Sequence, residues 1–271
     1  MTFRTYSMKR DVLMAEGPDA EAYLHGQISQ DVDDMSDGES RLSFLLEPKG
    51  NIESCFRITR LEQDHYVLDT EFGHGELLQS SLERFKLRSK VDFIFHQWKM
   101  VSIFGETQPA NIEPGVLALQ SSWVGVQYLD LLGDDPLLEL SECDHDEYQS
   151  LRYRYGLPVI GKEFQVGAIP NETDLLNLAV SFDKGCYRGQ ELVERIDSRK
   201  GGRKLLRRIR SDVAMSINEG LFEGDQKVGE VLAIASIPDY FGFASIRGEV
   251  EELTTEAGET VEYGSRSEGL A

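Results

Sequence analysis

The sequence has few cysteines and no recognisable spacing of metal-ligating residues. Its three cysteines, Cys55, Cys143 and Cys186, are far apart and odd in number, which argues against a disulfide framework. It has no Cys-x-x-Cys or His-Glu-x-x-His pattern, and its five histidines are scattered. We therefore predict no protein-held zinc or iron-sulfur site, and we interpret each histidine as a surface or packing residue.

Long apolar runs are absent as well. No segment approaches the roughly 18 apolar residues of a membrane-spanning helix, and the first ten residues lack the apolar stretch of an export signal. We predict no membrane partner and a cytoplasmic location. The sequence shows no internal repeat or low-complexity tract, and 271 residues with 40% hydrophobic content predict about two globular domains.

Basic residues are scarce overall but concentrated in one segment. The net charge of -20 argues against general affinity for nucleic acids or membrane surfaces. Residues 183–210 nevertheless carry ten basic and four acidic side chains, so this basic segment has a charge of +6 and the rest of the chain has -26. It could attract an anionic ligand, such as a carboxylate tail or, with weaker support, tRNA. The alternative is a solvated basic face.

The spacing of apolar residues predicts mixed helices and hairpins in the first half. Apolar positions from Leu24 to Met35 recur at helical spacing after an N-cap at Asp19, and Gly38 ends this predicted helix. Residues 41–46 and 51–61 form a predicted β-hairpin. Alternation along its second strand places Ile52, Ser54, Phe56 and Ile58 on one face and Glu53, Cys55 and Arg57 on the other. The mixed order favours an α+β fold over a doubly wound parallel sheet.

Two further patterns divide the second half. Asp144 and Glu147 resemble a capping box, opening a helix that carries Tyr148 and stops at Gly156. From Arg203 onward, short apolar runs alternate with glycines, which is the pattern of a small β-barrel. We therefore predict an α+β region over residues 1–202, with room for two subdomains, and a barrel domain over residues 203–271.

The densest chemical signal is the nonapeptide at residues 183–191, Asp-Lys-Gly-Cys-Tyr-Arg-Gly-Gln-Glu. An apolar run at residues 178–182 predicts a strand before it, and residues 190–196 predict a helix after it. Gly185 and Gly189 allow positive φ angles. A helix start and Lys184 both favour the thiolate form of Cys186, which makes Cys186 a candidate reactive thiol. The alternative is a structural cysteine in a tight turn.

This segment carries a family resemblance. Lys184-Gly185-Cys186-Tyr187-x-Gly189-Gln190-Glu191 resembles the signature of the YgfZ family of folate-binding proteins, which are related to the T-protein (aminomethyltransferase) of the glycine cleavage system. The opening of the first helix, the hairpin turn, Gly156-x-Pro158 and residues 224–231 are similar to the family in the same order. The resemblance implies two α+β parts and a β-barrel around a central folate pocket. It also implies tetrahydrofolate binding, assistance to iron-sulfur enzyme synthesis or repair, and a part in tRNA modification.

The resemblance and the residue chemistry together nominate the site residues. Cys186 matches the signature cysteine on which family activity depends, and Lys184 could favour its thiolate or hold a carboxylate tail. We predict five folate contacts: Tyr148, Tyr187, Gln190, Glu191 and Glu53. The two tyrosines would flank the ligand, and Gln190 and Glu191 would hydrogen-bond the pterin edge. Arg188 occupies the variable position of the signature and is left out of the site.

Three functions remain open from the sequence. The first is a folate-dependent helper of iron-sulfur enzymes that acts through Cys186. The second is aminomethyl transfer of the T-protein type, for which carboxylates are expected where this chain has Glu53 and Ser54. Because Ser54 replaces the second carboxylate, the transferase is the weaker alternative, and enzymatic activity is left open. The third is a folate-binding module without chemistry.

Overall fold

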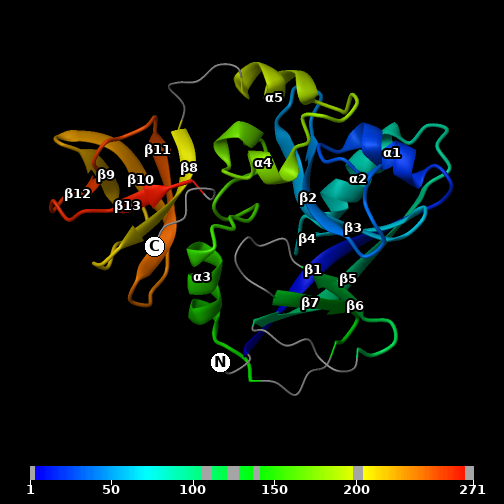
Figure 1. Ribbon diagram of the computed structural model, residues 1–271, viewed down its shortest axis with the longest axis horizontal. Coiled ribbons are helices and arrows are strands. Elements are labelled where there is room, and N and C mark those ends of the chain that lie inside the picture. The colour runs from blue at the N-terminus through cyan, green and yellow to red at the C-terminus, as the bar shows by residue number, and fades with distance from the viewer. Residues whose placement is uncertain (1–3, 105–111, 121–127, 137–140, 198–203, 266–271) are drawn as a thin grey trace. The chain divides into compact units, whose positions relative to one another are not determined.

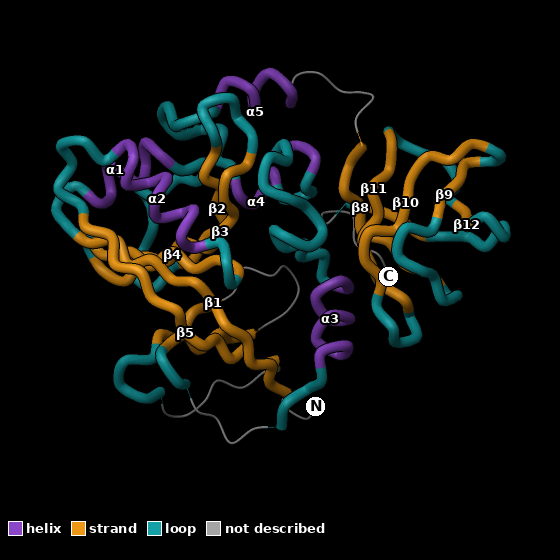
Figure 2. The backbone as a smooth tube through the Cα atoms, turned by 180° about the vertical axis from the view of Figure 1, so that it is seen from behind, coloured by secondary structure: helices purple, strands orange, loops and turns teal. Residues whose placement is uncertain are grey.

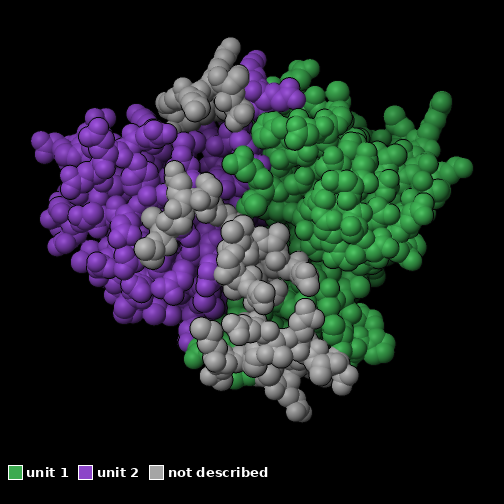
Figure 3. Space-filling view, viewed as in Figure 1, with its two compact units in different colours: residues 1–143, 177–192 green, residues 144–176, 193–271 purple. Residues whose placement is uncertain are grey.

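The computed structural model describes residues 4–104, 112–120, 128–136, 141–197 and 204–265. The chain forms two compact units (Figure 3). Unit 1 contains residues 1–143 and 177–192, and unit 2 contains residues 144–176 and 193–271. The chain therefore passes from one unit to the other three times.

Unit 1 is built on a seven-stranded antiparallel sheet. Its strands are β1 (Arg4–Glu16), β2 (Ser40–Leu46), β3 (Ile52–Glu62), β4 (His65–Glu71), β5 (Asp92–Phe104), β6 (Leu117–Gln120) and β7 (Tyr128–Gly133). They lie in the order β2-β3-β4-β1-β5-β7-β6. The long strands β1 and β5 pair along their whole length, from Arg4 opposite Phe104 to Glu16 opposite Asp92 (Figure 2).

One face of this sheet packs against two helices, α1 (Ala20–Gln27) and α2 (Gly75–Phe85) (Figure 1). Leu24 of α1 and Leu78 and Leu82 of α2 are fully buried in one cluster with strand residues such as Phe56 and Ile58. The three-to-four-residue spacing of apolar positions on each helix gives it one buried stripe. This cluster is the main hydrophobic core of unit 1.

The opposite face carries a buried charge network. Arg10 and Arg57 both bind the carboxylate of Asp69, with Arg10 Nη2 at 2.9 Å and Arg57 Nε at 2.7 Å. Arg57 also binds Asp130 at 2.5 Å, and Arg10 pairs with Glu71. Burial acts to raise the pKa of Asp69, but Arg57 and Arg10 hold that pKa below its ordinary value. The network joins strands β1, β3, β4 and β7, which are separate in the sequence.

Unit 2 contains α3 (His145–Arg154), the short 3-10 helix η1 (Pro170–Glu172) and a six-stranded antiparallel sheet. The strands are β8 (Lys204–Ser211), β9 (Gly220–Glu223), β10 (Gln226–Ile234), β11 (Tyr240–Arg247), β12 (Thr254–Thr255) and β13 (Glu262–Gly264), in the order β12-β9-β10-β11-β8-β13. Val231, Ala244 and Ile246 belong to the core on one side of this sheet. On its other side Tyr153 of α3 packs edge-on against Phe243, with ring centroids 5.7 Å apart.

Several predicted elements are confirmed. The hairpin forms as β2 and β3, and its turn has Gly50 at a φ of 88°. The capping box also forms, because Asp144 accepts a hydrogen bond from the backbone N–H of Glu147 at 2.8 Å and Glu147 binds back. The α+β class and the sheet in the C-terminal region are confirmed as well.

Two predicted elements are wrong. The first helix ends at Gln27 rather than Gly38, because Ile28 becomes extended and forms a bridge with Leu45 of β2. The expected strand at residues 178–182 is absent, and a short helix, α4 (Leu176–Ala179), is followed by a loop. This segment is held by Ser29 instead of by a sheet, since Ser181 N–H donates to the Ser29 carbonyl at 2.9 Å.

The compact units do not follow the predicted boundary at residue 202. Residues 144–176 belong with the C-terminal sheet in unit 2, because α3 packs on β11. Residues 198–203 lie outside the described ranges. The helix α5 (Gln190–Asp197) begins in unit 1 and ends in unit 2. In the described part of the chain, no helix is long and apolar enough to cross a membrane.

Candidate functional site

The loop that carries Cys186 is seated on the β2–β3 hairpin turn of unit 1. Gly189 has a φ of 84°, and a Cβ atom placed on it would lie 2.5 Å from the carbonyl oxygen of Glu47. Gly50, in the turn itself, is equally crowded, because its Cβ would lie 2.4 Å from Cβ of Leu192. Gly185 has space around it instead. The second glycine of the signature is therefore required by close backbone contact.

Cys186 is exposed, and its sulfur receives an oriented hydrogen-bond donor. The side chain of Gln190 accepts a hydrogen bond from Tyr187 N–H at 2.7 Å through Oε1. This bond fixes which end of the amide faces the thiol, so Nε2 donates to Cys186 Sγ at 3.7 Å. Gln190, predicted to contact folate, thus positions the thiol in the structure. The exposed thiol lies in the loop four residues before the first residue of α5, and its reactivity stays a prediction.

Lys184 is held by backbone carbonyls. Its ammonium group donates to the carbonyl oxygens of His25 at 2.6 Å, Ile28 at 3.0 Å and Gln30 at 2.7 Å. These bonds occupy all three of its donors. The ammonium also lies 5.4 Å from the centre of the buried Tyr187 ring. Lys184 therefore joins the signature loop to the end of α1, and its catalytic role stays a prediction.

Replacement of Lys184 by methionine should remove part of the rise in the free energy of unfolding that the unmodified protein shows at alkaline pH. Burial lowers the pKa of Lys184 from 10.5 to about 8, although Asp31 and Asp33 oppose this shift. Between these pH values the unfolded chain holds more protons than the folded chain, so this residue makes the free energy of unfolding rise with pH. The variant should lose about 1.5 to 3 kcal/mol through the missing hydrogen bonds. Its deficit should widen between about pH 8 and about pH 10.

Urea unfolding of both proteins at the two pH values measures this difference. Lys162→Met, which replaces an exposed lysine of unit 2, is the matched control and should show no change in deficit. If the deficit of Lys184→Met in the free energy of unfolding narrowed with rising pH, the lowered pKa of Lys184 would be contradicted.

Glu53 is neutralised by the residue that sequence reasoning left out. Arg188 forms an ion pair with Glu53, and Ser81 Oγ of α2 donates to Glu53 Oε1 at 2.5 Å. The Arg188 guanidinium also binds the Leu46 carbonyl oxygen and lies 4.8 Å from the centre of the Phe85 ring. Burial lowers the pKa of Arg188, and Glu53 opposes that shift. A largely buried carboxylate needs a cationic partner, which is the signal that could have identified Arg188.

Strict alternation around Glu53 was a wrong prediction. The pairing of β2 with β3 shifts by one residue, so that Leu46 lies opposite Ile52 and Leu45 lies opposite Ser54. Glu53 is the extra residue of this bulge. Its carboxylate reaches α2, on the side of the sheet where Leu45 and Phe56 lie in the core. Ser54 is fully buried, and its hydroxyl has no hydrogen-bond partner within the described part of the chain.

The remaining predicted contacts fall in two places. Glu191 is exposed in the first turn of α5, while Tyr187 is buried beneath Lys184. Tyr148 is buried on α3 and is described with unit 2. The unit 1 residues Glu53, Lys184, Cys186, Tyr187, Gln190 and Glu191 thus share one loop, its following helix and the adjoining hairpin. The placement of Tyr148 as their partner stays a prediction.

The described cations on β8 of the basic segment mostly have acidic partners. Arg210 pairs with Asp212, Asp239 and Glu262, Arg207 lies 3.7 Å from Asp174, and Lys204 pairs with Glu230. Arg208 is buried and donates to the Arg154 carbonyl at 2.6 Å. These contacts fit the alternative of a solvated basic face, whose positive charges are balanced by neighbouring acidic side chains. Arg199, Lys200 and Arg203 lie outside the described residues, and an anion-binding role stays a prediction.

Comparison with known proteins shows what the chain as a whole is similar to. No family model matches the chain. The sequence is 27% identical over 256 residues to the tRNA-modifying protein YgfZ of Klebsiella pneumoniae, covering 82% of this chain and 78% of that protein. The chain is a relative of the YgfZ proteins. The chain is also similar to a mitochondrial iron-sulfur cluster assembly factor, the IBA57 homolog of Chaetomium globosum, with 26% identity over 72% of this chain and 53% of that protein.

The fold of this YgfZ relative is that of a T-protein. The crystal structure of glycine cleavage system aminomethyltransferase T from Bartonella henselae matches with a TM-score of 0.77 and 16% identity, covering 96% of this chain and 85% of that one. The predicted T-protein-like fold is thereby confirmed. The likeness at this identity concerns the fold, and the predicted central pocket stays a prediction.

Proposed function

We propose that the chain is a tetrahydrofolate-binding protein that assists iron-sulfur enzymes, and through them tRNA modification, by means of the Cys186 thiol. The observation that carries the proposal is the exposed sulfur with the fixed Gln190 amide beside it. The names of the relatives, a tRNA-modifying protein and an iron-sulfur cluster assembly factor, support the same role. The protein would bind folate and contact iron-sulfur enzymes as its clients. Direct contact with tRNA is the less supported part of the proposal, because the chain is acidic overall.

The signature loop fits a folate only in part. Glu191 offers an exposed carboxylate that would accept hydrogen bonds from the aminopyrimidinone edge. Gln190 and Glu53 already have partners within unit 1, Tyr187 N–H and Arg188 respectively. We therefore assign the pterin contact first to Glu191, and the positioning of the thiol to Gln190. Tetrahydrofolate, when bound, would supply its one-carbon carrier nitrogen beside this loop.

Aminomethyl transfer is the less favoured function. That reaction would call for a carboxylate to stabilise a cationic iminium-like group. The carboxylate of Glu53 is instead bound by Arg188 and Ser81, and Ser54 replaces the second acid. A folate-binding module without chemistry remains the third candidate, and it predicts that the thiol is dispensable.

Replacement of Cys186 by alanine separates these functions. We expect tetrahydrofolate affinity, measured by calorimetry under reducing conditions, to change less than about threefold, since the thiol is not assigned to the ligand. In a strain that lacks its own family member, the variant should fail to restore iron-sulfur enzyme activity. Restored activity would favour the binding module.

Cys55→Ala is the matched control, because burial raises the pKa of the Cys55 thiol to about 12 and keeps it protonated. This variant should restore activity. Formation of methylenetetrahydrofolate from an aminomethyl donor would instead support the transferase. Absence of any folate binding by the unmodified protein would refute the central proposal.

A further inference from the structure

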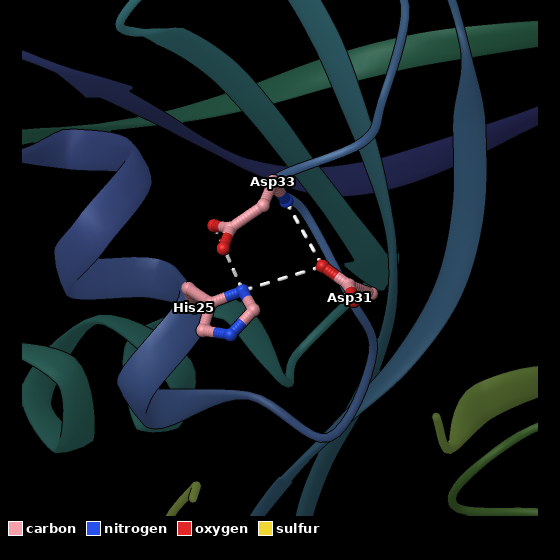
Figure 4. A group of neighbouring side chains, drawn as sticks. All are labelled: His25, Asp31 and Asp33. Atoms are coloured by element: carbon pink, nitrogen blue, oxygen red, sulfur yellow. Dashed lines mark hydrogen bonds and ion pairs between the residues drawn. The ribbon is translucent and has the colours of Figure 1, made fainter. Parts of the chain in front are cut away.

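A second cluster of chemically active side chains lies at the end of α1. His25 belongs to the last turn of α1, and Asp31 and Asp33 belong to the loop that follows (Figure 4). The sequence predicted no metal ligands, because a spacing of six and two residues matches no standard motif. The chain becomes extended at Ile28, after the helix, and the loop that follows brings the three side chains together.

The geometry of the cluster differs from that of an ordinary histidine ion pair. His25 Nδ1 lies 2.9 Å from Asp33 Oδ1 and 3.3 Å from Asp31 Oδ1. Nδ1 is buried, yet it forms a hydrogen bond with neither oxygen. Neither oxygen therefore lies where it would complete a hydrogen bond with Nδ1. The pair His65 and Glu62 provides the contrast, since His65 Nδ1 does form a hydrogen bond with Glu62 Oε1 at 2.8 Å.

This arrangement fits ligands that surround a cation. Ligand atoms held at about 2.1 Å from one metal lie about 3.0 to 3.4 Å from each other when the bond angles are between 90° and 109°. Both nitrogen-to-oxygen distances in the cluster are close to this range. A metal bound to Nδ1 would have one oxygen of each carboxylate nearby, because the three ligand atoms all lie within 4.8 Å of one another. The two nitrogen-to-oxygen separations thus agree with ligands that share one ion.

The surrounding contacts hold the ligands in place. Asp31 Oδ1 accepts a hydrogen bond from Asp33 N–H at 3.0 Å, and Asp31 N–H binds the side chain of Gln30 at 2.9 Å. The Lys184 ammonium fixes the carbonyls of His25 and Gln30. Its single positive charge offsets only one of the two carboxylates, so the cluster keeps a net attraction for cations. Supporting contacts of this kind orient ligands at metal sites.

We propose that His25, Asp31 and Asp33 form a mononuclear site for a divalent first-row transition-metal cation, for which Zn²⁺ and Mn²⁺ are the probes. The imidazole nitrogen favours such ions over Mg²⁺ and Ca²⁺, which prefer oxygen ligands alone. Asp33 has a side chain that is 59% exposed, so water can complete the coordination shell. The other ring nitrogen of His25, Nε2, lies 3.7 Å from the point where a Cβ atom on Gly185 would be. A bound cation would therefore anchor this ring beside the loop of Cys186.

Isothermal titration of the full chain with Zn²⁺, and separately with Mn²⁺, tests the site. We expect one equivalent to bind, and Asp33→Asn to weaken the affinity at least tenfold. Asp33→Asn is the decisive variant. Because the Asp33 side chain is exposed, its substitution should not unfold the protein, and weaker cation binding would reflect the loss of a ligand. His25→Ala should abolish binding. Thermal unfolding adds a second readout, since the cation should raise the Tm of the unmodified protein but not that of Asp33→Asn.

Two control variants keep the test specific. Glu62→Gln alters the other histidine pair and should leave affinity unchanged. Cys186→Ala should also bind normally, and Co²⁺ loaded into the unmodified protein should show no thiolate charge-transfer band. Failure of the unmodified protein to bind either cation, unchanged binding in Asp33→Asn, or lost binding in Cys186→Ala would each overturn the proposal. None of these outcomes depends on folate or on iron-sulfur enzyme activity.

Discussion

Replacing Asp69 with asparagine should lower the free energy of unfolding by about 3 to 5 kcal/mol. The Asp69 carboxylate is fully buried and accepts hydrogen bonds from both Arg10 and Arg57. Asparagine has nearly the same volume but no charge, so two largely buried guanidinium groups would lose a shared counter-ion. Urea unfolding at neutral pH measures the loss.

The pH dependence of this deficit provides a further check. Because the pKa of Asp69 is held below its ordinary 3.8 by Arg57 and Arg10, its stabilising effect is complete above that pH and is lost as the pH falls further. The deficit of Asp69→Asn should therefore shrink in strong acid. Asp37→Asn, which breaks the exposed pair with Arg60, should cost only about 0 to 1 kcal/mol. If the two variants lost the same free energy of unfolding, the buried network would contribute no more to stability than the exposed pair.

Replacing Gly189 with alanine should cost about 3 kcal/mol or more, through a positive φ angle and steric overlap together. The new Cβ would lie 2.5 Å from the Glu47 carbonyl oxygen and 2.8 Å from Leu46 Cβ. Relief of this overlap would move the loop away from the hairpin turn. We therefore expect the reactivity of Cys186 toward iodoacetamide to change as well, because Gln190 and the thiol would shift with the loop.

Gly38→Ala is the matched control for this prediction. Gly38 has a similar φ of 81°, but among the described residues other than its two chain neighbours no atom lies within 4 Å of the position that a Cβ would occupy. Its substitution should cost only the backbone strain, about 1 to 2 kcal/mol, and should leave Cys186 alkylation unchanged. Urea unfolding and alkylation rates of both variants measure the contrast. A Gly189→Ala cost no larger than that of Gly38→Ala would show that the loop is not seated on the hairpin as described.

The elements that the sequence predicted well depend on nearby residues. The turn between β2 and β3 needs Gly50, and the start of α3 needs Asp144 and Glu147, and both signals lie within four residues. The predicted α1 failed for the opposite reason. Ile28 has helical spacing from Leu24, but its pairing with Leu45 outweighs the local preference. Periodicity alone does not reveal such a distant partner.

The site shows the same division. The signature identified the loop and its exposed cysteine, because glycine, thiol and helix start are neighbours in the chain. The bulge at Glu53 and the ion pair with Arg188 join residues 135 positions apart. No alternation rule shows a bulge, since the extra residue reverses the expected face. Arg188 was left out because it occupies the variable position of the signature, although it is the partner of the predicted carboxylate.

The sequence by itself determined the α+β class, the hairpin, the capped helix α3 and the presence of a helix shortly after Cys186. Only the tertiary structure decided which charges meet: Arg188 with Glu53, Arg10 and Arg57 with Asp69, and His25 with Asp31 and Asp33. Turns and caps are fixed by hydrogen bonds between close neighbours in the chain. The pairing of buried charges instead depends on which distant strands and loops pack together in the folded core, so the local sequence does not reveal it.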